Sequence, residues 1–260
     1  MDLQLNGKTA LITGGSKGIG FATAQALVAE GVSLHLASRD PEALATAKSA
    51  IQADHDVDVT THALDLGTTE AINELSVAVG NVDILVNNAG AIAAGTIEAI
   101  DEETWRYGWD LKVFGYINLS RLIYPKMKAR GTGVIVNVCG TAGNQPASDH
   151  LPATTANSAL ITMTRSMGGT SLNHGVRVVG INPGDCINER GMMFLRRYAE
   201  KNLGDAERWA ESLEDLPGGK AATSEDMANT IAFLASPRAG YISGEVLTID
   251  GGVSAGRAVI

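Results

Sequence analysis

The feature that most constrains the fold is a glycine-rich turn between an apolar run and an alanine-rich stretch. The run Lys8-Thr9-Ala10-Leu11-Ile12 is typical of a buried parallel strand, and residues 21–30 predict a helix. Between them lies Thr13-Gly14-Gly15-Ser16-Lys17-Gly18-Ile19-Gly20. These glycines permit a tight turn and let phosphate oxygens approach the free N–H groups at the helix start. The order strand, turn, helix predicts the first unit of a doubly wound α/β sheet that binds a nucleotide.

Composition narrows the class of protein further. The 260 residues contain no linker-like segment, so we expect one domain spanning residues 1–260. A net charge of −9 with no basic run argues against nucleic acid or an anionic membrane as partner. No apolar stretch approaches the roughly 20 residues of a membrane span, and no secretory signal is visible. Two cysteines provide neither a disulfide framework nor a zinc pattern. We therefore expect a cytoplasmic protein without a bound metal.

Further motifs follow the glycine turn at regular intervals. They are Asn87-Asn88-Ala89-Gly90, Asn182-Pro183-Gly184 and residues 244–252. With the Gly-x-x-x-Gly-x-Gly spacing after Thr13, this set resembles the short-chain dehydrogenase/reductase family over nearly the whole chain. The resemblance implies a Rossmann-like three-layer fold with a seven-stranded, mainly parallel sheet. It also implies a nicotinamide cofactor, oxidoreduction between a carbonyl and a secondary alcohol, and a homotetramer or homodimer formed through a helix at residues 110–130.

The residues after the second predicted strand, 33–37, bear on cofactor choice. An acidic side chain there would accept hydrogen bonds from a ribose 2′-hydroxyl, whereas an arginine would pair with a 2′-phosphate. The chain has Ser38 and Arg39, with Lys17 nearby in the glycine turn. We therefore expect NADP(H) to be preferred over NAD(H), and Asp40 to cap the following helix at 42–53. The resemblance places the other cofactor contacts at Gly14, Ser16, Gly18, Ile19, Gly20, Asp65, Leu66, Asn88, Ala89, Gly90, Val138, Pro183, Gly184, Ile187 and Asn188.

The catalytic positions of the family are where the chain departs from the pattern. Aligned by its flanking residues, the family's serine falls on Gly140, its tyrosine on Ala153, its lysine on Asn157 and its asparagine on Lys112. We expect no tyrosine near the site. The usual groups that exchange a proton with the substrate oxygen are therefore missing from this alignment.

Three interpretations remain open. In the first, an atypical enzyme uses Lys112, Asn157 and His150, which follows Asp149, for proton transfer. In the second, the chain is a catalytically inactive pseudoenzyme that binds cofactor and acts as a regulatory or oligomer partner. In the third, Cys139 or Cys186 is a nucleophile, although no adjacent base supports this and inert buried thiols are favoured.

Residues 188–216 are predicted to cover the substrate as a lid. This segment carries methionines, aromatic residues and the pair Arg196-Arg197. The apolar residues would form a wall, and the two arginines would meet a carboxylate or phosphate of a substrate. The competing interpretation is ordinary helix packing with solvated charges.

Overall fold

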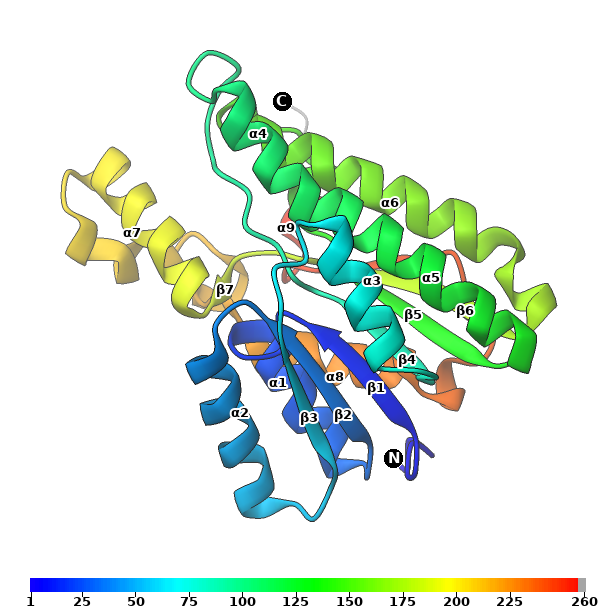
Figure 1. Cartoon of the computed structure of the whole chain (residues 1–260). Coiled ribbons are helices and arrows are strands. Elements are labelled where there is room, and N and C mark those ends of the chain that lie inside the picture. Colours follow the sequence, from blue (N-terminus) through cyan, green and yellow to red (C-terminus); the bar gives the residue numbers. More distant parts are fainter. Residues whose placement is uncertain (257–260) are drawn as a thin grey trace.

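The computed structural model describes residues 1–256. Its centre is a seven-stranded sheet in the order β3-β2-β1-β4-β5-β6-β9, in which every neighbouring pair is parallel (Figure 1). The strands are β1 (Thr9–Thr13), β2 (Ser33–Ser38), β3 (Val59–Ala63), β4 (Ile84–Asn87), β5 (Gly133–Val138), β6 (Val176–Pro183) and β9 (Val246–Ile249). This confirms the Rossmann-like fold predicted from the sequence.

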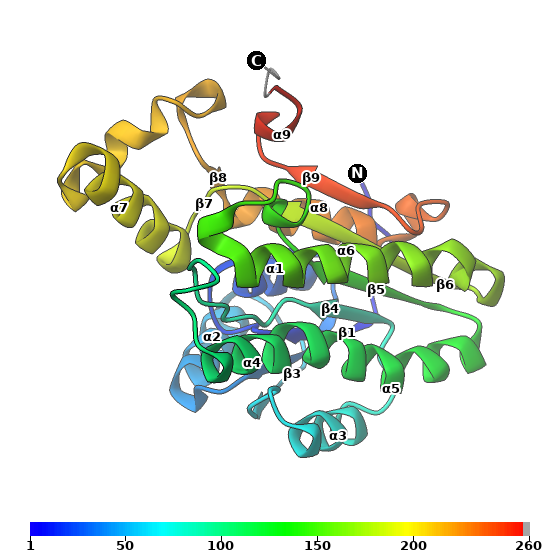
Figure 2. The same ribbon diagram turned by 90° about the horizontal axis from the view of Figure 1, so that it is seen from above.

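Helices cover both faces of the sheet and give the predicted layers (Figure 2). One face carries α1 (Gly18–Ala29), α2 (Pro41–Asp54) and α8 (Ser224–Ala235), and the other carries α3 (Thr69–Ala78), α5 (Gly115–Arg130) and α6 (Leu151–Ser171). The remaining helices are α4 (Glu102–Trp109), α7 (Glu189–Leu203) and α9 (Val253–Gly256). No helix within residues 1–256 is long and apolar enough to cross a membrane.

The core follows the alternation of side chains along the strands. Ile12 and Leu36 pack with the α1, α2 and α8 face, whereas Leu11 and Leu85 pack with α3 and α5. Because consecutive side chains point to opposite faces, a strand buried on both sides must be apolar throughout. The run at β1 meets this requirement, which explains why it was recognisable from sequence.

A buried polar network ties the two central strands together. The side-chain amide of Asn87 donates to Asn137 Oδ1 at 2.9 Å and to Ser120 Oγ at 3.1 Å, and Asn137 Nδ2 donates to Thr164 Oγ1 at 2.9 Å. These residues join β4, β5, α5 and α6. Buried hydrogen bonds of this kind favour one packing of the helices on the sheet.

The long helix predicted at 110–130 begins with a different geometry. Residues Asp110–Phe114 form a π-helical turn, closed by the Gly115 N–H donating to the Asp110 carbonyl, and α5 continues from there. Widened turns of this kind are rare and occur frequently at functional sites. Lys112 lies in the middle of this one.

The segment after β6 leaves the sheet and forms a separate projection. Strand β7 (Cys186–Ile187) pairs with β8 (Ala222–Thr223), and α7 and a 3₁₀ segment at Ala206–Leu213 extend between them (Figure 1). This projection corresponds to the lid predicted at 188–216. We also expect the chain after Gly252 to touch a partner subunit, and this stretch falls partly on residues 257–260, which lie outside the described residues.

Candidate active site and cofactor cleft

The glycine turn has a backbone that other residues would not tolerate. Gly14 and Gly18 have φ values of +65° and +54°. A Cβ on Gly20 would lie 2.1 Å from the Gly14 carbonyl oxygen, so α1 can pack this closely only with glycine there. A Cβ on Gly18 would meet nothing nearer than Asn188 at 3.9 Å, which leaves space over the helix start. This turn therefore offers free N–H groups to a phosphate.

Asn88 joins the glycine turn to the neighbouring strand. Its side-chain amide donates to the carbonyl oxygens of Thr13 at 3.0 Å and Gly14 at 3.2 Å. In return, the Thr13 hydroxyl accepts from the backbone N–H groups of Asn88 and Ala89 at 2.9 and 3.0 Å. Asn88 therefore ties the carboxyl ends of β1 and β4 together.

A pocket of about 430 Å³ lies beside the turn, lined by Ser16, Lys17, Ser38, Arg39 and Asp40. The hydroxyls of Ser16 and Ser38 are 3.0 Å apart. Asp40 caps α2, as predicted, because its Oδ1 accepts the N–H groups of residues 42 and 43 at 3.0 Å each. The carboxylate of Asp40 therefore interacts with the start of α2 rather than with a ribose.

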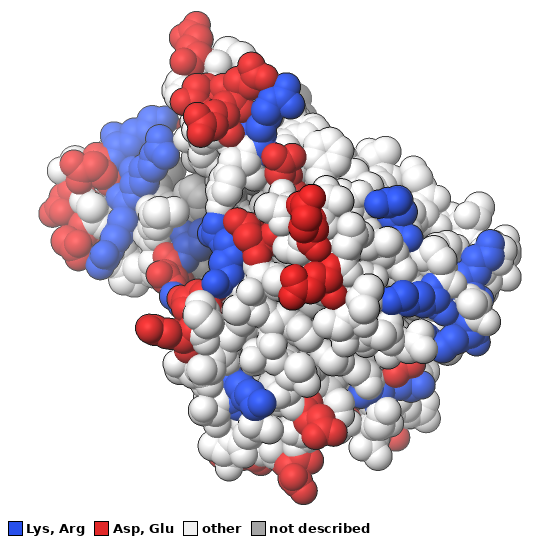
Figure 3. All heavy atoms as spheres, in the orientation of Figure 1, with Lys and Arg blue, Asp and Glu red and all other residues white. Residues whose placement is uncertain are grey.

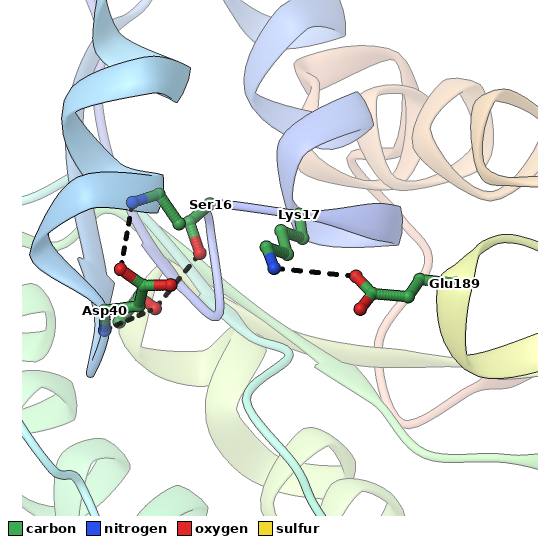
Figure 4. Close-up of polar contacts among 6 residues, drawn as sticks. Ser16, Lys17, Asp40 and Glu189 are labelled. Atoms are coloured by element: carbon green, nitrogen blue, oxygen red, sulfur yellow. Dashed lines mark hydrogen bonds and ion pairs between the residues drawn. The ribbon is translucent and has the colours of Figure 1, made fainter.

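Two cations border this pocket. The guanidinium of Arg39 donates to the hydroxyl of Tyr107 on α4 and lies over its ring. Lys17 Nζ lies 3.6 Å from a carboxylate oxygen of Glu189, at the start of α7 (Figure 4). Tyr107 was not identified from sequence, because nothing local indicates that α4 crosses the end of β2.

The other predicted cofactor contacts lie on loops at the same sheet edge. Asp65 Oδ1 accepts the Gly67 N–H at 3.0 Å, and Leu66 is buried beside it. Gly184 donates to the Ile249 carbonyl at 3.0 Å, which fixes the turn after Pro183. Ile187 is exposed on β7. Asn188 caps α7, its Oδ1 accepting the N–H of residue 191 at 2.9 Å, and its amide nitrogen donates to Cys186 Sγ at 3.3 Å and Ser224 Oγ at 3.5 Å.

Lys112 reaches the end of β5 from the π-helical turn. Its stem passes Gly90 so closely that a Cβ there would lie 3.0 Å from Lys112 Cδ. Its Nζ donates to the Cys139 carbonyl oxygen at 2.9 Å. Burial lowers the pKa of the ammonium to about 8, and the neighbouring Arg190 charge acts in the same direction. Lys112 is therefore not a solvated surface cation, and it can exchange a proton near neutral pH.

Asn157 stands against the residue that follows Cys139. A Cβ on Gly140 would lie 2.9 Å from Asn157 Nδ2, so the small residue makes room for the amide. Within residues 1–256, Asn157 Oδ1 and Asn182 Nδ2 are buried without a hydrogen-bond partner. Buried polar atoms are rarely left unpaired. These two are among six such atoms in the described range, and both of their residues contact Gly140: Asn157 stands against it, and Asn182 Oδ1 accepts its N–H at 3.3 Å.

Ala153 supplies no polar group and packs with Ile92 and Val113.

The expectation that no tyrosine lies near the site was wrong. Tyr116 comes one helical turn after Lys112, and its hydroxyl donates to the Val138 carbonyl at 3.1 Å. The side chain is 2 % exposed and burial raises its pKa well above the usual value, so it closes the wall rather than meeting substrate. The spacing of four residues between Lys112 and Tyr116, which places both side chains on one face of a helix, was the signal in the sequence that could have indicated this tyrosine.

His150 lies at the mouth of the cleft rather than beside Lys112. Its Nδ1 is 3.1 Å from Asp149 Oδ1, and its ring contacts Phe194 of α7 at 5.8 Å between centroids. Across from it, burial raises the pKa of Asp185, which the His150 charge opposes. Sequence reasoning missed Asp185, a carboxyl at the end of β6 next to a predicted cofactor turn. The structure thus joins Lys112 and Asn157 at one strand end and leaves His150 at the lid.

Both cysteines are buried and free. Burial raises the pKa of Cys139 to about 11 and that of Cys186 in the same direction. Thiols of this kind are poor nucleophiles because little thiolate forms near neutral pH. The structure therefore agrees with the inert interpretation.

A short chain dehydrogenase family profile matches residues 8–192. The chain therefore belongs to this family of oxidoreductases. Among curated relatives, the 3-oxoacyl-[acyl-carrier-protein] reductase of Vibrio cholerae is 31% identical, with 96% of this chain and 99% of the relative covered. L-xylulose reductase of mouse is 32% identical, with 97% and 98% covered. L-sorbose reductase of Gluconobacter frateurii, solved with NADPH and L-sorbose, is 32% identical, with 98% and 99% covered and a TM-score of 0.91.

Proposed function

We propose that the protein is an NADP(H)-dependent oxidoreductase that interconverts a carbonyl and a secondary alcohol through a non-standard active site. The observation that carries the proposal is Lys112, a buried ammonium with a pKa of about 8 at the end of β5. Lys112 Nζ bonds to the carbonyl of Cys139, and Asn157, whose amide oxygen is unpartnered, stands against the next residue, Gly140. Hydride transfer to a carbonyl leaves an alkoxide, which needs a nearby proton donor whose pKa is near the working pH.

The residues at the cleft fit a nicotinamide dinucleotide. The glycine turn leaves space and free N–H groups for a diphosphate, and orphaned polar atoms stand near the ends of β5 and β6. Bound there, the nicotinamide would supply or accept the hydride. Lys17 and Arg39 at the adjacent pocket support a preference for a 2′-phosphate. The relative solved with NADPH supports the same cofactor.

In the proposed reaction, side chains of this protein transfer the proton to and from the substrate oxygen. In reduction, the Lys112 ammonium would donate a proton to the substrate oxygen and be left as an amine. Its bond to the Cys139 carbonyl orients Nζ and leaves it two further hydrogens. Asn157 would hold a polar group of the substrate or a bridging water through its free Oδ1. Tyr116 and the apolar side chains around Ala153 would exclude bulk water from one wall.

The second candidate is a cofactor-binding pseudoenzyme. Gly140 and Ala153 bring no hydroxyl to the site, and the hydroxyl of Tyr116 is committed to a backbone carbonyl. Such a protein would act through an oligomer, and a homotetramer or homodimer is our prediction in either case. Light scattering on a sizing column measures this directly.

The test starts with calorimetric titration of NADPH and NADH into the protein and its Arg39→Ala variant. We expect NADPH to bind more tightly than NADH, and Arg39→Ala to weaken NADPH binding about tenfold to a hundredfold, as for a lost charged hydrogen bond. NADH binding should not change. Arg106→Ala is the matched control, because Arg106 lies on α4 next to Tyr107 but pairs with Glu102 at 2.7 Å. Equal affinity for both cofactors would refute the preference.

Catalysis is tested with a panel of ketones and NADPH. Lys112→Met should lower kcat by roughly 10²–10⁴-fold, the range for a positioned acid, while NADPH affinity is retained. Unchanged rates would remove Lys112 from the mechanism. Tight NADPH binding without turnover of any ketone would favour the pseudoenzyme.

A further inference from the structure

The lid helix α7 presents one face with a distinct composition. Arg190, Phe194, Arg197 and Lys201 are spaced four, three and four residues apart, so they lie along a single stripe of the helix. We call these four residues the lid stripe. Leu195 and Ala199 lie on the other side, where both are buried as α7 packs against the segment Ala206–Leu213. The helix therefore has an inner, apolar contact face and a separate cationic face.

Contacts show that the lid stripe is turned toward the cleft. The guanidinium of Arg190 donates to the carbonyl oxygens of Gly90 at 2.6 Å and Ile92 at 3.2 Å, on the loop after β4. Lys201 Nζ lies 3.6 Å from Asp149 Oδ2, on the loop after β5. Phe194, between them, contacts the ring of His150 on that same loop. Residues at the start, middle and end of the stripe thus all face loops at the carboxyl edge of the sheet.

Arg197 lies on the stripe between Phe194 and Lys201 but differs from its neighbours. Within residues 1–256 it makes no hydrogen bond or ion pair, and it is exposed. Arg196, which the sequence grouped with it, lies about 100° around the helix. It pairs instead with Glu207 at 3.6 Å. The expectation that both arginines meet a substrate is therefore corrected to one of them.

The charges along the stripe do not balance. Arg190 bonds to carbonyl oxygens, which are neutral, and only Lys201 has a carboxylate partner. Lys112 is a further cation, and it lies close enough to Arg190 for that charge to lower the pKa of Lys112. The charged neighbour of Asp185 is His150, not the arginines of the stripe. Figure 3 shows blue side chains along the flank of the lid that faces the body, with red ones on its outer flank. In a protein with a net charge of −9, this local excess favours an anion.

We propose that the substrate of this site carries an anionic group, a carboxylate or a phosphate ester, which Arg197 binds from the lid at a distance from the reacting carbonyl. The proposal rests on the proposed function. The rise of 1.5 Å per residue puts Arg197 about 10 Å along α7 from Arg190, which lies next to Lys112. The anion and the carbonyl should therefore be separated by a chain of about eight bonds rather than two or three.

The experiment compares ketones that share one carbon chain. The probes are 9-oxodecanoate, its methyl ester, and 9-oxodecyl phosphate, each with NADPH. We expect kcat/KM for one of the anions to exceed that for the ester by about tenfold or more, as charged hydrogen bonds generally allow. Whether the carboxylate or the phosphate is used better identifies the source of the anion. The short acid 4-oxopentanoate should lose this advantage over its own methyl ester.

Variants assign the effect to the lid stripe. Arg197→Gln should lower kcat/KM for the preferred anion about tenfold and leave the ester within twofold, and Arg197→Lys should recover part of the loss. Arg196→Gln is the matched control and should change neither. Equal use of anions and ester by the wild type, or an equal loss for both with Arg197→Gln, would overturn the proposal.

A readout without turnover separates this proposal from the proposed function. Sebacate, a dicarboxylate that cannot be reduced here, is titrated into NADPH-saturated protein by calorimetry. If no ketone is turned over but sebacate binds and Arg197→Gln weakens it about tenfold, the anion site stands and the reaction does not. Failure of sebacate to bind the wild type, with the oxo anions also showing no advantage, would overturn the anion site.

Discussion

Lys112 makes a prediction about stability that does not depend on any substrate. Its pKa is about 8 in the folded protein, against 10.5 for a lysine in water. Between these values the unfolded chain holds a proton that the folded chain has released. The free energy of unfolding therefore rises with pH in this window, by up to 1.36 kcal/mol per pH unit. Below pH 8 the lysine is protonated in both states, and no gain appears.

The size of the effect follows from the two pKa values. Between pH 7 and pH 10, the contribution of residue 112 to the free energy of unfolding rises by about 2.5 kcal/mol in the wild type and by zero in Lys112→Met. Urea unfolding measures the free energy of unfolding of both proteins at both pH values. The change with pH for Lys112→Met is subtracted from that for the wild type, so the contributions of other titrating groups cancel. Both proteins should carry Cys139→Ala, because the adjacent thiol also titrates in this range. Lys128→Met on the exposed side of α5 is the control and should give no difference.

The Arg190→Gln variant provides a second test in the same unfolding experiment. Its charge contributes to the low pKa of Lys112, so Arg190→Gln should raise that pKa and shrink the pH-dependent gain. A wild type and Lys112→Met whose unfolding free energies stay parallel within about 0.5 kcal/mol from pH 7 to pH 10 would refute the reasoning. The ammonium would then be as well hydrated in the folded protein as in water.

Three further predictions concern the cofactor cleft. Gly20→Ala should destroy the close approach of α1 to the Gly14 carbonyl, where a Cβ would lie at 2.1 Å, and NADPH should no longer bind measurably by calorimetry. Asn88→Ala removes two hydrogen bonds to the carbonyls of Thr13 and Gly14 and should lower the unfolding free energy by about 2 kcal/mol in urea. Asp40→Ala removes the cap of α2 and should cost about 1 kcal/mol by the same measurement, without converting cofactor preference toward NADH.

The sequence predicted the scaffold well because scaffold signals are local. The apolar run at β1, the glycines that follow it and the Asp40 cap each depend on neighbours within a few positions. The site was predicted less completely. Lys112 and Tyr116 were both visible in the sequence, but their depth depends on β5, which lies about twenty residues further along the chain.

The lid shows the same limit more sharply. The sequence suggested that a pair of arginines would meet the substrate, and adjacency in sequence was the reason to group them. On a helix, adjacent residues point about 100° apart. Arg196 therefore pairs with Glu207 of the segment Ala206–Leu213, while Arg197 lies on the stripe that includes Arg190. Which of the two arginines faces the loops after β4 and β5 could be decided only once contacts fixed the rotation of α7.

If Lys112 donates the proton as proposed, its position explains how such a group could move without loss of the fold. The carboxyl ends of parallel strands lie at one edge of the sheet, so side chains from the helical segment before β5 and from the helix after it can reach the same strand end. Here Lys112 comes from the first and Asn157 from the second, and they meet at consecutive residues, Cys139 and Gly140. A cation brought from either side would stand near the same substrate oxygen. The backbone needs only a widened turn at Asp110–Phe114 and a glycine at position 140 to accept the exchange.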